Sequence, residues 1–86
     1  MILYVVVVRD RAADVFGQPT FTTALGMAVR SFADTVNTPD KDNVIAKHPE
    51  DFDLYSIGTY NDRTAKFEFE PDGPRMIAVG KDCVRK

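Results

Sequence analysis

The chain has 86 residues, enough for a single domain over residues 1–86 and too few for two hydrophobic cores. Lys and Arg number 11 against 13 Asp and Glu, and this net charge of -2 excludes a strongly basic protein that condenses nucleic acid. The single cysteine excludes an intramolecular disulfide. The longest apolar run, Met1 to Val8, is far shorter than the ~20 residues of a spanning helix and has no cationic start. We therefore expect no membrane span and no signal peptide.

The N-terminal segment predicts a strand followed by a loop. Four consecutive valines favour β structure over residues 2–8, and both faces of this strand are apolar. Gly17 and Pro19 interrupt regular structure, so residues 12–21 are expected to form a loop.

One substantial helix is predicted over residues 23–37, approximately, because apolar residues recur there at spacings of four, three and four. The residues of this stripe are Leu25, Val29, Phe32 and Val36. Pro39 stops the helix. Gly26 weakens it by ~1 kcal/mol relative to alanine, and we expect this glycine to allow close approach to a neighbouring strand.

The second half of the chain predicts three strands. A polar connection over residues 38–51 leads to strands at residues 52–60, 66–70 and 76–79. The sequence KFEFE of the middle strand alternates strictly, which predicts that Phe67 and Phe69 face inward. Residues 81–86 are expected to form a flexible charged tail.

These elements indicate an α+β fold, a small mixed sheet in β-α-β-β-β order with the long helix on one face. If the first two strands share a sheet, the helix is a right-handed crossover that makes them parallel. The predicted core is Val5, Val7, Leu25, Val29, Phe32, Val36, Leu54, Phe67 and Phe69.

One helix covers only one face of such a sheet, so the other face is expected to expose apolar side chains and to form a homodimer. The residues predicted there are Tyr4, Val6 and Val8 from the first strand, together with some of Tyr55, Ile57 and Tyr60. In the competing arrangement, the loop carrying Phe16 and Phe21 folds over this face.

The residue types give little support to an enzyme. His48 and Cys83 are the only histidine and cysteine, so a Cys/His zinc site cannot be assembled within one chain. His48 is predicted to be a cap and turn residue. The acidic residues between Pro39 and Asp53 lack the regular ligand spacing of a metal-binding loop. The glycines form no phosphate-binding motif. We expect no catalytic residue, metal or cofactor.

Two features favour binding of single-stranded DNA. Residues 75–86 carry four basic residues and one acidic residue, net +3, whereas residues 1–74 carry seven basic and twelve acidic residues, net -5. Aromatic residues fall on the predicted strands, and single-strand binders stack bases on such residues. The candidate DNA-binding residues are Arg75, Lys81, Arg85, Lys86, Arg9, Arg11, Arg30, Tyr55 and Tyr60. The alternative interpretation is that the aromatics form the core and the tail serves solubility.

Four segments together span nearly the whole chain: LYVVVVRDRAADVFGQPTF, GMAVRSFADTVN, KHPEDFDLYSIGTYND and AVGKD. They resemble the small nonstructural protein of gokushovirus-type microviruses, the single-stranded DNA phages that include those of Chlamydia. The stretches His48 to Asp62 and Arg30 to Asn37 carry most of the resemblance.

The resemblance implies a protein made in the cytoplasm of the infected bacterium and absent from the virion. Members of that family are described as nonstructural, and some as DNA-binding or connected with DNA synthesis and packaging. Our first hypothesis is therefore a non-enzymatic accessory protein of phage DNA replication or packaging that binds single-stranded DNA weakly or through a phage replication or assembly partner. The second is a protein-interaction module that acts on a phage or host protein without contacting DNA.

Overall fold

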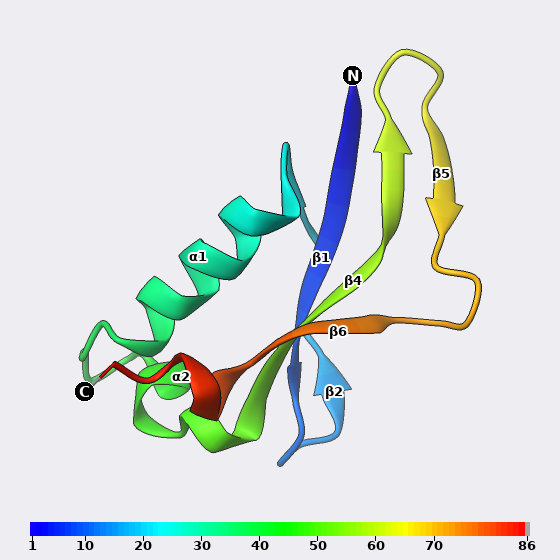
Figure 1. The fold of residues 1–86 in the computed structure, drawn as a ribbon. Helices are drawn as coiled ribbons and strands as arrows, with labels where there is room; N and C mark the ends of the chain where they lie inside the picture. The colour runs from blue at the N-terminus through cyan, green and yellow to red at the C-terminus, as the bar shows by residue number, and fades with distance from the viewer. Residues whose placement is uncertain (86) are drawn as a thin grey trace.

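The computed structural model describes residues 1–85. Over these residues an antiparallel sheet of six strands carries one main helix, so the predicted α+β class is confirmed. In Figure 1 two long central strands run side by side, and the helix lies along one side of them. None of the described helices is long and apolar enough to cross a bilayer.

The two long strands, β1 (Ile2–Asp10) and β4 (Phe52–Asn61), pair antiparallel along their whole length. Ile2 lies opposite Asn61 and Asp10 lies opposite Phe52, so the expected parallel pairing is wrong. The reason is the connection: the chain first runs back along β1, and the helix then returns it to the end where β1 finished. A strand that starts at that end is antiparallel to β1.

The returning segment consists of two short strands, β2 (Val15–Phe16) and β3 (Thr20–Thr22), which both pair with β1. The sequence predicted a loop over residues 12–21, and that prediction is wrong at the four strand residues that fall within this range, residues 15, 16, 20 and 21. Gly17 and Pro19 interrupt the edge of the sheet without removing it, and the Gly17 N–H donates to the Val8 carbonyl at 2.8 Å.

Two further strands, β5 (Lys66–Phe69) and β6 (Arg75–Val79), pair with the edge of β4 that faces away from β1. Strand β5 pairs with the C-terminal half of β4 and β6 with its N-terminal half. The sheet therefore consists of a long two-stranded ribbon with two short strands along each edge.

The main helix, α1 (Leu25–Val36), is followed by a short helix α2 (Val44–Lys47) and by the 3-10 turn η1 (Pro49–Asp51). A second 3-10 turn, η2 (Gly80–Cys83), follows β6. Gly26 makes no close approach to a strand, because a Cβ atom at this position would meet nothing within 4 Å. That expectation was wrong.

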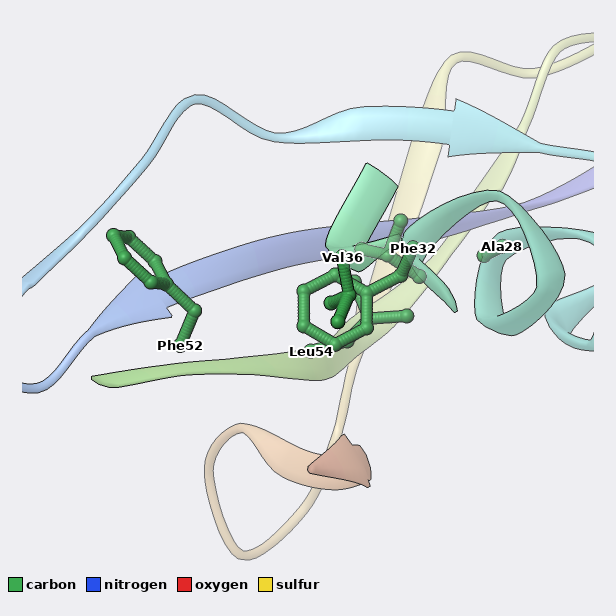
Figure 2. Packing of buried hydrophobic residues seen from close by; sticks show 6 residues of the cluster. Ala28, Phe32, Val36, Phe52 and Leu54 are labelled. Carbon is green, nitrogen blue, oxygen red and sulfur yellow. The ribbon is translucent and has the colours of Figure 1, made fainter. Parts of the chain in front are cut away.

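The core lies between α1 and the sheet, where Phe32 and Val36 lie over Leu54 (Figure 2). Its buried members are Val6, Ala28, Phe32, Val36, Phe52 and Leu54. Since side chains alternate along a strand, Val6 under the helix places Val5 and Val7 on the other face. Val5 and Val7 are buried as predicted, but the predicted register of β1 against the helix was wrong by one residue.

Candidate nucleic-acid interface

The face of the sheet opposite α1 carries a continuous group of aromatic rings, which we call the aromatic surface: Phe21, Tyr60, Phe67 and Phe69. The ring centroids of Phe21 and Tyr60 are 5.5 Å apart, and those of Tyr60 and Phe67 are 4.7 Å apart. The rings of Phe67 and Phe69 lie nearly parallel, at 4° and 5.8 Å. Four side chains from three strands thus form one row of rings.

These rings are open to solvent. Phe21 is 51% exposed, Phe67 46% and Phe69 70%, while Tyr60 is half-buried. The predicted inward orientation of Phe67 and Phe69 is therefore wrong. Strict alternation correctly places both on one face of β5, but the helix covers the other face of the sheet.

Strand register explains why the rings meet. Val5 on β1 lies opposite Phe21 on one side and opposite Gly58 on the other, and Leu3 lies opposite Tyr60. Gly58 in turn lies opposite Phe69, with φ at +148°, in the region that favours glycine. A Cβ atom at this position would overlap the Glu68 carbonyl oxygen and come within 2.8 Å of the Phe69 Cα. Gly58 therefore allows β5, and with it two of the rings, to lie against β4.

A second, smaller aromatic contact lies further along the same face. Phe16 on β2 meets Tyr55 on β4 edge to face, with centroids 5.5 Å apart, and the Arg9 guanidinium lies 5.5 Å from the Phe16 centroid. Arg9 also pairs with Asp14 at 2.7 Å, and this contact, with one to Tyr55, raises the pKa of Arg9. Of the two predicted tyrosines, Tyr60 belongs to the aromatic surface, whereas Tyr55 is buried.

Within residues 1–85, the structure does not bring the predicted basic residues to the aromatic surface. Arg85 forms an ion pair with Asp34 of α1 at 2.8 Å, on the helix side, and Arg30 is exposed on α1 itself. Arg75 lies 3.5 Å from Glu70. Arg11 pairs with the buried carboxylate of Asp53 at 3.0 Å, so it has a structural role in tying the end of β1 to β4.

The C-terminal segment is attached to the helix over its described part. The Asn37 side-chain amide donates to the Cys83 carbonyl at 2.8 Å, and the Arg85 N–H donates to the Asn37 Oδ1 at 2.8 Å. Burial raises the pKa of the Cys83 thiol, because the thiolate is poorly solvated there. Lys81 is exposed on η2, and Lys86 lies outside the described residues.

Sequence reasoning missed two other features. His48, Glu50 and Asp51 place their ligand atoms within 4.8 Å of one another, but His48 and Glu50 are exposed. These three groups alone do not make a metal centre, because nothing buried orients them. The second feature is a groove of about 350 Å³ between β3 and α1. Its floor includes Val6 and Phe32, which already belong to the core.

Comparison with known proteins gives one match. Residues 3–83 match the model of a family described as "Phage ORF5 protein". No curated protein and no solved structure shows significant similarity.

Proposed function

The chain belongs to the Phage ORF5 protein family, since the family model matches residues 3–83, and from this premise we propose that it is a non-enzymatic accessory protein of phage DNA replication or packaging. It acts in the cytoplasm of the host bacterium, outside the virion, and binds single-stranded DNA weakly on the aromatic surface. The resemblance to the nonstructural proteins of gokushovirus-type phages supports single-stranded DNA as the ligand, because such phages carry that form of genome.

The observation that carries this proposal is the exposed row of rings on an uncovered sheet face. Phe21, Phe67 and Phe69 are each about half exposed or more, although solvent exposure of large apolar rings is unfavourable. Antiparallel sheets that bind single strands use such rings as stacking platforms for unpaired bases. The span of the row over β3, β4 and β5 provides ring faces for more than one base.

Charge sets the expected strength and salt dependence of this binding. Arg9 lies beside Phe16, further along the same face as the aromatic surface, and Asp14 already pairs with it. Arg85 and Arg75 are paired with acidic residues elsewhere. We therefore expect stacking to dominate and the log–log salt slope to be about -1 or shallower, at ~0.7 per phosphate, in place of the roughly -3 that four basic residues would give.

Fluorescence anisotropy with a labelled single-stranded oligonucleotide at low salt tests the proposal. Phe69→Ala removes the most exposed ring and should weaken binding by about 1–3 kcal/mol, while the fold is retained. Val44→Ala is the matched control, because Val44 is an apolar residue on the short helix α2 that is 52% exposed and lies away from the aromatic surface. Equal affinity of the two variants and the original protein, or no binding at all, would reject DNA binding on this surface.

The scarcity of positive charge beside the rings favours a second candidate, a protein-interaction module. An exposed apolar patch with few charges is typical of a protein-binding surface. In that case DNA binding is absent, and capture of phage or host proteins from infected cells persists after nuclease treatment and is lost in Phe69→Ala.

A further inference from the structure

The outer edge of β5 is an unpaired strand edge. Strand β5 lies at the end of the sheet, and within residues 1–85 its only strand partner is β4 (Figure 1). All four of its residues are exposed. Unpaired edges can add a strand from another chain, and they are usually protected by a proline, a bulge or charged side chains that repel an added strand. Strand β5 contains no proline and pairs with β4 in continuous register.

The hydrogen-bond pattern shows which backbone groups this edge offers. The Glu70 N–H donates to the Ile57 carbonyl of β4 at 3.0 Å. Bonding alternates along an antiparallel strand, so Glu68 and Lys66 also direct their backbone groups to β4. The N–H and carbonyl groups of Phe67 and Phe69 therefore point away from the sheet, toward any added strand.

We propose that β5 pairs antiparallel with β5 of a second copy of this chain, with Phe67 opposite Phe67 of the partner. In this register the outward-pointing groups of the two Phe67 residues bond to each other. Lys66 of each copy then lies opposite Glu68 of the other copy, at close pairs where side chains of opposite charge attract. The strand KFEF is thus complementary to itself under a two-fold axis.

The neighbouring registers lack this complementarity. Shifting the centre of pairing to Glu68 places the two Glu68 carboxylates opposite each other, and shifting it to Phe69 places Glu68 opposite Glu70. Like charges directly opposite each other are unfavourable. In this two-fold pairing the corresponding faces of the two sheets lie on the same side of the dimer. The aromatic surfaces of the two copies therefore join. The association is independent of DNA binding and is measured without DNA.

Sedimentation equilibrium from low micromolar to millimolar protein provides the test. The original protein should dimerise, and Lys66→Glu and Glu68→Lys alone should each weaken the dimer about tenfold or more, because two attractive pairs become repulsive. An equimolar mixture of the two single variants should form a heterodimer, since every Glu then faces a Lys. The double variant Lys66→Glu/Glu68→Lys should dimerise like the original protein.

Arg30→Glu is the control, a charge reversal at an exposed position of α1 that should leave the dimer unchanged. Circular dichroism of each variant checks that the fold is retained. A monomer at the highest concentration would overturn the proposal. Single reversals without effect, or a mixture that fails to restore association, would equally overturn the β5 pairing.

Discussion

The two faces of the sheet are built from the same strands, yet they differ in what covers them. Under α1, Val6 and Leu54 are 4% and 3% exposed, and their neighbours are apolar side chains of the helix. On the other face Val5 and Val7 are equally buried, although no helix covers them there and the rings of Phe16 and Phe21 on the flanking strands remain open to solvent. The comparison shows that an apolar strand with two hydrophobic faces does not require a layer of helices on each side.

The difference assigns separate roles to the two faces. Burial of apolar surface at ~25 cal/mol per Å² makes the helix-covered face the main source of stability. The exposed rings contribute less to folding, because they keep much of their contact with water. The exposure of several large rings in a chain of only 86 residues is the observation on which our proposal of binding at that face rests.

The largest expected effect comes from a residue of the helix-covered face. Phe32 is 5% exposed in the middle of the core, so Phe32→Ala should lower the free energy of unfolding by about 3–5 kcal/mol. A domain of this size has only about 4–13 kcal/mol in total, so the variant should be largely unfolded on mild warming. Thermal and urea denaturation measure the loss. Unchanged melting would mean that α1 packs in another register.

An intermediate effect on stability is expected at Gly58, which allows the strand that carries Phe67 and Phe69 to lie against β4. Gly58→Ala should lower the free energy of unfolding by about 2–3 kcal/mol, because it combines an unfavourable backbone angle with a clash against β5. The amide groups of β5 should exchange faster with solvent, while those of α1 are less affected.

Gly26→Ala is the matched control on the other face. Gly26 lies in α1 with open space around its Cα, so alanine should raise the free energy of unfolding by about 1 kcal/mol. If both glycine variants were equally tolerated, β5 would not need its close approach to β4.

Much of this fold follows from local sequence patterns. The valine run, the helical stripe and the KFEFE alternation predicted β1, α1 and β5 within one or two residues, and the segments FDLYSIGTY and MIAV predicted β4 and β6 equally well. The antiparallel direction of β4 relative to β1 did not follow from local patterns. It depends on β2 and β3, whose five residues are too few to give a periodic signal. Because of Gly17 and Pro19, Phe16 and Phe21 were predicted to lie in a loop, whereas the structure places them on the edge strands β2 and β3.

The aromatic surface, where we propose binding, was harder to predict than the fold. Alternation shows that Phe67 and Phe69 share a face, but only the position of α1 decides whether that face is covered. Charge segregation toward the C-terminus suggested a basic DNA-binding tail, whereas Arg85 is paired with Asp34 of α1. An ion pair between residues so far apart in sequence has no local signature. Of the eight candidates among residues 1–85, only Tyr60 lies in the aromatic surface.

The smallest expected effect on stability gives the sharpest test of the two-face comparison. Phe69 is as large as Phe32, but it is 70% exposed and its main neighbour is the ring of Phe67. Phe69→Ala should therefore change the free energy of unfolding by less than about 0.5 kcal/mol, the range of surface substitutions. Urea denaturation at low micromolar protein measures this value without a contribution from self-association. A loss as large as that of Phe32→Ala would mean that the ring is covered in the monomer, and the aromatic face would then be a second core.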